Sequence, residues 1–433
     1  MSPHRKKPET NTIEAEVSSP EAALIERGFA PARLLASFKY RDYRYFLSGA
    51  LLSNIGTWMQ MIALGWLVLA MTNSPFYVGF VNFTANAPVF FIVLFAGVAA
   101  DRLDRRSLII WTQTAMMIFA FILAFLTSAH RISIPLIVAI TLATGVSTAF
   151  NFPAWQAIIS DIVPRKDLLN AIALNSAQFH TARLVGPALA GIVLGVWGAA
   201  SNFYLNAFSF LAVILALLAI RPQKIEKPDT KESIRAHFMR GFHYAWRRPV
   251  IIALLATTGL ITLFGMPFVA LMPIFARDIL KVGAKGFGFL LAANGFGALV
   301  GALTVAYLAH TVRRETLIKI GATLFGVFLI LFALSHNFWL SMIFLAGVGG
   351  SFLLTTSSIN TSLQHLTPGE MRGRIMSMFV WAFLGIMPFG ALIFGAVAEK
   401  FNAPLAVLIG GSVCVLTGLV LTINRHLIRQ PTS

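Results

Sequence analysis

The apolar residues of this chain occur in blocks about twenty residues long, the length at which an α-helix crosses the roughly 30 Å hydrocarbon core of a bilayer. Short polar joints separate the blocks, and only 12% of the 433 residues are charged. A water-soluble domain carries about twice that fraction. The sequence therefore predicts an all-α integral membrane protein with twelve transmembrane helices. They are expected at about 45–71, 77–100, 107–128, 134–152, 170–195, 202–220, 249–275, 286–308, 317–335, 338–362, 375–398 and 404–423.

Positive charge is distributed unevenly over the joints. The formal net charge of +17 would by itself also suit a protein that binds nucleic acid. When both termini are placed on one side of the membrane, 28 Lys and Arg residues fall on that side, five fall on the other, and Arg183 lies inside a helix. Cytoplasmic loops carry such an excess. The sequence thus predicts a multi-pass inner (cell) membrane protein with both termini cytoplasmic and no nucleic-acid partner.

The longest internal polar stretch divides the expected helices six and six. Within it, Ser233 to Trp246 suits an amphipathic helix on the membrane surface, and a solvated linker fits its first half equally well. Because Cys414 is the only cysteine, no intrachain disulfide is expected. The expected organisation is a disordered cytoplasmic tail (1–37), a first six-helix half (38–220), a cytoplasmic linker (221–248), a second six-helix half (249–424) and a cytoplasmic tail (425–433).

The two halves share a few residues at equivalent places. At a shift of 204 positions the matched pairs are Pro164 with Pro368, Gly186 with Gly390, and Gly191 with Gly395. Transporters built from two parallel six-helix halves hold their substrate between the halves, near the bilayer midplane. The repeat favours a transporter over a helical channel or a membrane enzyme.

The most specific motif follows the second expected helix and reads GVAADRLDRR over 97–106. An ordinary positive-inside loop would explain the arginines but not a carboxylate, Asp101, four residues after Gly97. The motif resembles the loop 2–3 signature of the major facilitator superfamily, G-x-x-x-D-R-x-x-R-R/K. The resemblance implies that Gly97, Asp101, Arg102, Arg105 and Arg106 form a cytoplasmic gate lock that is made in one access state and broken in the other.

A second motif lies in the fifth expected helix, where Gly186 and Pro187 are followed by Gly191. Proline bends a transmembrane helix, and small residues let helices approach closely. Generic helix packing explains each residue singly. Together they resemble the fifth-helix antiporter motif of exporters in this superfamily, although Ala182 and Ala190 stand where stricter forms carry glycine. The resemblance favours export over uptake.

Arg183 is the single cation in the middle of an expected helix, with His180 one turn earlier on the same face. An isolated arginine in hydrocarbon is costly, so it should face a cavity, bind backbone carbonyls at the Pro187 bend, or bind an anion. A structural role and a substrate or coupling role both remain open for this pair, and His180 alone most often serves packing. No carboxylate lies in the middle of an expected helix. Proton coupling is therefore implied only by the resemblance.

Several polar and aromatic residues fall in helices expected near the molecular centre. Each is a candidate cavity residue, and each is equally a common interhelical hydrogen-bond partner. Met61 shares one face of the first helix with two of them. The candidates are Asn54, Trp58, Asn151, Gln178, Asn294, Asn360 and Trp381.

From about residue 38 to 423 the chain resembles the enterobactin-exporter and macrolide-efflux-like branch of the superfamily. The stretches that carry this resemblance are 153–176, 286–301 and 307–310. It implies a monomeric secondary active transporter in the lipid bilayer that exports small amphiphilic organic molecules, siderophore-like or drug-like, by alternating access and proton antiport. Uptake of a metabolite, and a receptor or scaffold without flux, remain alternatives. We find no nucleotide-binding loop, no metal-spaced His, Cys and Asp cluster and no nucleophile with a matching base, so neither an enzyme nor a cofactor is expected.

Overall fold

The computed structural model describes residues 35–220, 234–308, 311–424 and 427–428, without the side chains of 93–95, 97–102 and 234–238. Within these ranges all regular structure is helical. Most of the expected N-terminal tail (1–37), the first part of the expected linker (221–233) and most of the expected C-terminal tail (425–433) lie outside the described residues.

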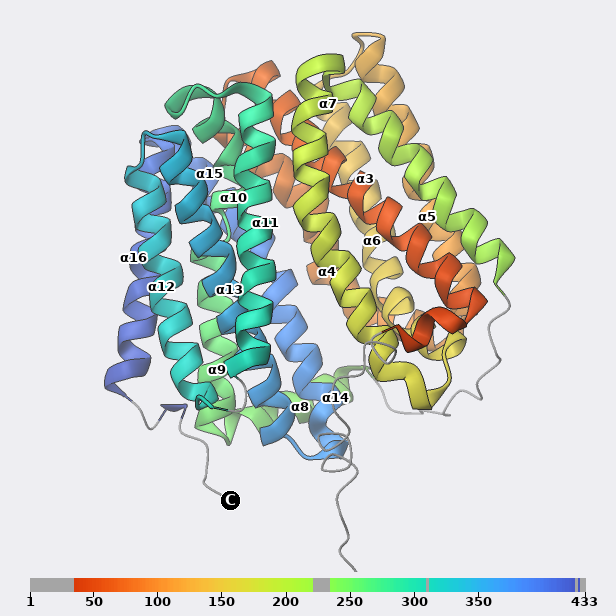
Figure 1. Cartoon of the computed structure of the whole chain (residues 1–433), viewed down its shortest axis with the longest axis vertical. Helices are drawn as coiled ribbons and strands as arrows, with labels where there is room; N and C mark the ends of the chain where they lie inside the picture. Colours follow the sequence, from red (N-terminus) through yellow and green to blue (C-terminus); the bar gives the residue numbers. More distant parts are fainter. Residues whose placement is uncertain (1–34, 221–233, 309–310, 425–426, 429–433) are drawn as a thin grey trace, which may run out of the picture.

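Helices α3 to α7 form the first bundle (Figure 1). Within it α3 and α5 pack on α7, and α4 packs on α6. A one-turn 3-10 helix, Ala36–Lys39, precedes the bundle. The helices are α3 (Arg41–Thr72), α4 (Pro75–Arg102), α5 (Arg105–Ser128), α6 (Ile134–Ile162) and α7 (Leu168–Ala219).

Helix α7 consists of two consecutive membrane helices. Its 52 residues would extend roughly 78 Å if straight, far beyond the thickness of a bilayer. At Gly198 the backbone takes φ 78°, a conformation that glycine adopts without steric cost. The chain reverses there, and the two legs correspond to the helices predicted at 170–195 and 202–220.

Helices α8 to α16 form the second bundle (Figure 1). Two of its membrane-crossing segments are interrupted by π-helical turns, which are frequent at functional sites. The turns Ile261–Gly265 and Trp381–Gly385 are each followed within three residues by a proline, Pro267 or Pro388. The helices are α8 (Ile234–Trp246), α9 (Pro249–Leu260), α10 (Phe268–Ile274), α11 (Gly283–Leu308), α12 (Arg314–Leu334), α13 (Phe338–Leu366), α14 (Gly369–Val380), α15 (Met387–Lys400) and α16 (Ala403–Ile423).

Eleven helical spans in the described ranges are long and apolar enough to cross a membrane. Because the longest of them contains the reversal at Gly198, they make twelve crossings. The all-α membrane fold predicted from the apolar blocks is confirmed. The helix expected over 249–275 runs further, through a second π turn at Phe275–Ile279, and the one expected over 375–398 is broken into α14 and α15.

Helix α8 precedes the first crossing of the second bundle and packs on α14. Ala245 is buried, whereas Phe242 and Trp246 are exposed and stack on each other. These large apolar side chains suit the bilayer interface. The amphipathic helix expected over Ser233 to Trp246 therefore forms from Ile234 onward.

Buried apolar side chains show where the two bundles join. We name the end of the molecule at which α3 begins and α16 ends the terminal face, and the other end the opposite face (Figure 1). Near the opposite face a single core contains residues of both bundles, for example Phe203 and Phe275. Toward the terminal face one core, around Phe46, belongs to the first bundle and another, around Phe379, to the second. The bundles thus share one apolar core near the opposite face and have separate cores toward the terminal face, where α8 of the second bundle also contacts α4 of the first.

Candidate functional site: the interface between the bundles

Two helix pairs carry the junction between the bundles, α7 with α11 and α4 with α15. Glycine makes both approaches possible, because a Cβ atom on Gly288 would overlap the carbonyl oxygen of Pro187, and one on Gly79 would overlap that of Ala391. Helices in lipid associate through such close small-residue contacts. The relative position of the bundles therefore depends on a few positions that accept no side chain.

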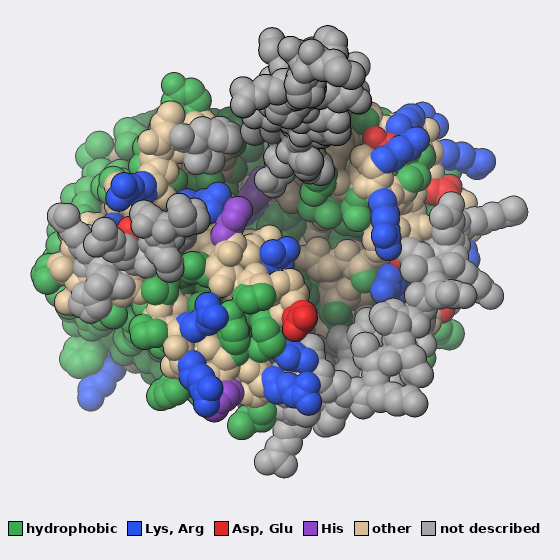
Figure 2. All heavy atoms as spheres, turned by 90° about the horizontal axis from the view of Figure 1, so that it is seen from below, with side chains coloured by type: hydrophobic (Ala, Val, Ile, Leu, Met, Phe, Trp, Pro, Cys, Tyr) green, Lys and Arg blue, Asp and Glu red, His purple; other side chains and the backbone are tan. Residues whose placement is uncertain are grey.

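A cavity of about 220 Å³ lies between the bundles toward the opposite face. Helices α3, α4 and α6 supply most of its wall, and residues of α10 and α11 complete it, so it is shared by both bundles. Its polar lining comes from Gln60, Asn82, Asn86 and several threonines of α6, and Met61 also lines it. At the terminal face, Lys and Arg side chains lie around a hollow (Figure 2).

None of the seven candidate cavity residues lines this cavity. The Asn54 side chain donates a hydrogen bond to Gln178 Oε1 over 3.2 Å and joins α3 to α7. Asn151 Oδ1 accepts from Thr112 Oγ1 at 3.0 Å, within the first bundle. The structure thus brings these candidates into interhelical hydrogen bonds.

The remaining candidates are also in contact with neighbouring side chains. Trp58 packs against the backbone at Gly186, and Asn360 Oδ1 accepts from Gln364 Nε2 at 2.6 Å. The ring of Trp381 lies 4.9 Å from that of Phe90, so it bridges the two bundles. Asn294, the last candidate, contacts Arg183.

The loop 2–3 motif lies at the terminal face between α4 and α5. Asp104 caps α5 by accepting from the backbone and hydroxyl of Ser107. Arg105 forms an ion pair of 2.7 Å with Asp161 of α6. Arg106 donates to the carbonyl oxygens of Leu217 and Leu218 in the last turn of α7, where a positive charge is favoured. Both arginines therefore connect helices of the first bundle, and the side chains of Gly97, Asp101 and Arg102 lie outside the described residues.

The fifth-helix motif residues lie at two packing surfaces of α7. A Cβ on Gly186 would lie 2.7 Å from the Cβ of Trp58, so this glycine lets α3 approach. A Cβ on Gly191 would lie 2.9 Å from the carbonyl oxygen of Ala284, so that glycine lets α11 approach. Pro187 is buried between them. The motif therefore contributes to the junction between the bundles.

Arg183 and Asn294 form a polar contact inside the membrane. The Nη2 atom of Arg183 donates to Asn294 Oδ1 at 2.8 Å, and the Nδ2 atom of Asn294 donates to the carbonyl oxygen of Leu345. Arg183 therefore joins α7 of the first bundle to α11 of the second. The Nδ1 atom of His180 is buried without a hydrogen-bond partner among the described residues.

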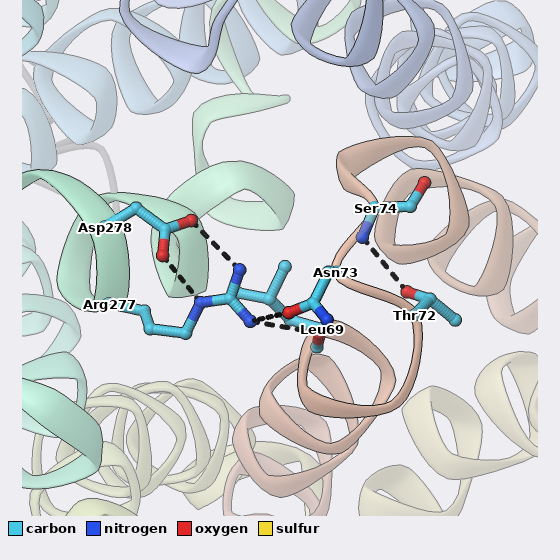
Figure 3. Close-up of polar contacts among 6 residues, drawn as sticks. All are labelled: Leu69, Thr72, Asn73, Ser74, Arg277 and Asp278. Carbon is cyan, nitrogen blue, oxygen red and sulfur yellow. Dashed lines mark hydrogen bonds and ion pairs between the residues drawn. The ribbon is translucent and has the colours of Figure 1, made fainter.

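A polar clamp at the opposite face was not predicted from the sequence (Figure 3). Arg277 of the second bundle donates to the carbonyl oxygen of Leu69 at 3.1 Å and to Asn73 Oδ1 at 2.8 Å. Asp278 holds the same guanidinium through two hydrogen bonds. Glu399, also of the second bundle, accepts from the hydroxyl of Ser74 at 2.8 Å.

We name these contacts the opposite-face clamp; they join Arg277, Asp278 and Glu399 of the second bundle to residues 69–76. The clamp fixes the turn between α3 and α4 to the second bundle. Asn73 there has a left-handed backbone, φ 51°, so the turn is tight. The turn itself could have been found from its Asn-Ser-Pro sequence. The partners could not, because they lie 204 to 325 residues away.

Twelve membrane crossings in two helical bundles, joined at one face and hollow at the other, define a transporter of the major facilitator fold. The chain belongs to the Transmembrane secretion effector family, whose profile matches residues 32–431.

Named relatives agree with this family. The Staphyloferrin A transporter of Staphylococcus aureus is 26% identical, over 89% of this chain and 96% of its own length. The Multidrug efflux pump Tap of Mycolicibacterium fortuitum is 25% identical, over 82% of this chain and 88% of its own. The Enterobactin exporter EntS of Escherichia coli is 26% identical, over 85% of this chain and 89% of its own length.

Solved structures match in fold. The nucleoside transporter NupG superposes with a TM-score of 0.69 at 14% identity, covering 90% of this chain and 100% of that one. The D-xylose-proton symporter superposes with a TM-score of 0.69 at 13% identity, covering 88% of this chain and 97% of that one. The family and its named relatives show that the chain is a membrane transporter and not an enzyme.

Proposed function

We propose that this transporter exports small amphiphilic organic molecules, siderophore-like or drug-like, by alternating access with proton antiport. The observation that carries the proposal is the single apolar core shared near one face, with separate cores toward the other face and a cavity lined by both bundles. A two-state carrier must open to one side while the other is held closed. The names of two relatives, a multidrug efflux pump and an enterobactin exporter, support export as the direction.

The topology follows from the same proposal. The terminal face is cytoplasmic, because the Lys and Arg excess gathers there. The halves are 38–220 and 249–424, joined by the linker 221–248, with tails at 1–37 and 425–433, and the chain acts as a monomer. In this state the pathway is open to the cytoplasm and the opposite-face clamp closes its outer end.

In the second state of the proposed cycle, the pathway is open to the outside and closed to the cytoplasm. When the outer end opens, the terminal faces of the bundles must approach each other. Asp101 and the arginines of the loop 2–3 motif lie on that face and would then form the inner lock. Asn54, Trp58, Asn151, Gln178, Asn294, Asn360 and Trp381 stay candidates for the wall of the pathway during this movement.

The deciding experiment compares spent medium and cell extracts of cells with and without the gene by untargeted mass spectrometry. Export predicts compounds that fall in the medium and rise inside the cells when the gene is lost. The reverse change in both compartments would instead establish uptake. Complementation with Asp101→Asn should fail to restore the medium, while Arg165→Gln, an exposed arginine on the same face, should restore it.

Proton coupling has its own test. In proteoliposomes loaded with a compound from that comparison, an imposed pH gradient should accelerate its movement, and nigericin should abolish the acceleration. A rate that follows only the gradient of the compound itself would contradict antiport.

A further inference from the structure

We propose that Arg183, His180 and Asn294 form a binding site for the anionic group of an amphiphilic substrate. This inference rests on the proposed transport function and adds the charge of the substrate. Five points support it: the face of α7 that carries Arg183, the partners of the guanidinium, the orientation of Asn294, the position of the contact along the bundles, and the unpartnered nitrogen of His180.

Helix periodicity places Arg183 on the face of α7 that looks into the space between the bundles. At 3.6 residues per turn, Arg183 lies between the position that packs on α3, Gly186, and the one that packs on α11, Gly191. The exposed apolar Ile192 lies half a turn away from Arg183, on the opposite side of the helix. Because α7 has neighbours on two flanks, its two free sides face the lipid and the central space. The apolar side faces the lipid, so Arg183 faces the central space.

The guanidinium of Arg183 is only partly satisfied by the protein. It has five N–H donors, and in the described ranges its hydrogen bond goes to Asn294 Oδ1. No ion pair in those ranges pairs it with a carboxylate. The structure also does not place it on the backbone carbonyls at the Pro187 bend. An intramembrane arginine on this face, without a counter-charge in the described ranges, is therefore suited to a ligand that supplies the negative charge.

Asn294 holds the guanidinium at the junction of the bundles. Its Nδ2 atom is engaged by the Leu345 carbonyl of α13, which leaves Oδ1 directed at Arg183. A Cβ on the next residue, Gly295, would lie only 2.7 Å from the carbonyl oxygen of Arg183. Of the glycine contacts between α7 and α11, this one lies nearest to the terminal face. An anion bound to Arg183 is thus held where the bundles begin to separate, within reach of both.

His180 extends the site by one turn toward the terminal face. Its Nδ1 atom is buried and has no hydrogen-bond partner among the described residues. A buried nitrogen without a partner is destabilising, and an acidic group bound beside Arg183 would give it one. Arg183 thus supplies charge, and His180 a further hydrogen bond.

The test uses purified protein in lipid nanodiscs and two probes that differ only in charge, 2-naphthoate and its neutral isostere 2-naphthamide. Microscale binding measurements should show the wild-type protein binding the acid about 10- to 100-fold more tightly, the range that one charge-assisted hydrogen bond gives. Arg183→Gln should remove this preference. Arg183→Lys should retain most of it, because the charge remains.

A second variant covers the case in which Arg183→Gln does not fold. Asn294→Asp places a carboxylate where the amide oxygen now accepts from Arg183. It loses the hydrogen bond to the Leu345 carbonyl but gains an internal ion pair with Arg183, so it should fold and bind acid and amide equally. Arg131→Gln, an exposed loop arginine, is the matched control and should keep the preference. Equal wild-type affinities for the two probes, or an Asn294→Asp protein that still prefers the acid, would overturn the proposal.

The binding result stands apart from the export experiment. Gene-dependent compounds that prove neutral and are exported normally by Arg183→Gln would leave export intact and refute the anion site. Anion-selective binding without any gene-dependent compound in the medium would support the site and count against export.

Discussion

Arg105 shows, at the scale of single residues, how a sequence motif acquires a concrete partner. The resemblance of the loop 2–3 motif predicts a gate role for this arginine, and the structure pairs it with Asp161 on α6 of the same bundle. The exposed fractions of the two side chains are 22% and 10%, so the pair is largely shielded from water. A shielded ion pair is destabilising when one partner is removed, because the other charge stays behind.

Removing one charge of this pair should therefore lower stability. We expect Arg105→Gln or Asp161→Asn to reduce the free energy of unfolding in detergent by about 2 kcal/mol, between the values for exposed and for buried pairs. The double variant should lose less than the sum of the two, since neither charge is then left unpaired. Denaturant unfolding followed by tryptophan fluorescence measures all three, with Arg165→Gln as the exposed control. Strictly additive losses would show that the two side chains do not interact.

Residue types alone could indicate chemistry but not partners. Arg183 was recognised as an intramembrane cation with carbonyl, cavity and anion alternatives, and its contact with Asn294 lies 111 residues along the chain. Asn54 and Gln178 are each candidates for the cavity wall, and the structure adds that their side chains are hydrogen-bonded to each other. Periodicity gives the face on which a residue lies, whereas the neighbour of that face is set by tertiary packing.

At the scale of helices, the sequence was most informative where length and hydropathy decide. Every expected membrane helix has a counterpart, because a bilayer imposes both a length and an apolar composition. Backbone irregularities were not predicted, such as the π turn Ile261–Gly265. A π turn adds only one residue to a helical turn, so the hydropathy of the segment stays that of an ordinary membrane helix. The reversal at Gly198 was expected as a joint, but its single-residue tightness depends on a left-handed backbone.

The close approach of α7 and α11 depends on glycines that leave no room for a methyl group. In Gly288→Ala the new methyl group would overlap the Pro187 carbonyl, which destabilises this closed junction by about 1–3 kcal/mol. The equilibrium should then move by about 5- to 150-fold toward the state that is open at the opposite face.

The measurement uses the buried Cys414 replaced by serine and a cysteine introduced at Met61, which lines the cavity. A membrane-impermeant thiol reagent added outside spheroplasts should label this cysteine faster in Gly288→Ala. Gly369→Ala, where a Cβ meets nothing within 4 Å, should leave the rate unchanged. Equal labelling rates in both variants would show that this junction does not control access.

Across the whole molecule, the distribution of cores and charges fits one state of the proposed two-state carrier. The shared core near the opposite face makes the bundles one body there, whereas the separate cores near the terminal face let each bundle move as a unit. Such rigid-body movement needs a reversible fastening at the closed end. Apolar packing is non-directional, so the directional part of this fastening is the opposite-face clamp.

The clamp is made of two contacts at different helix ends, and its removal should open the closed face stepwise. Arg277→Gln loses the charge that binds the end of α3, and Glu399→Gln loses the charge that binds the start of α4. Each should shift the equilibrium by about fivefold, corresponding to about 1 kcal/mol for a partly exposed charge-assisted bond. Because the two contacts share no partner, the double variant should show the product of the two shifts.

Labelling from outside of the cysteine introduced at Met61 measures this shift. The control is Lys400→Gln, because Lys400 is next to Glu399 but has no bond to the first bundle in the described ranges. Net export should fall as labelling rises, since a carrier that rests open to the outside meets its cytoplasmic substrate less often. Unchanged labelling with unchanged export in the double variant would mean that the apolar core alone closes this face. Increased labelling with unchanged export would place the slow step of transport outside this movement.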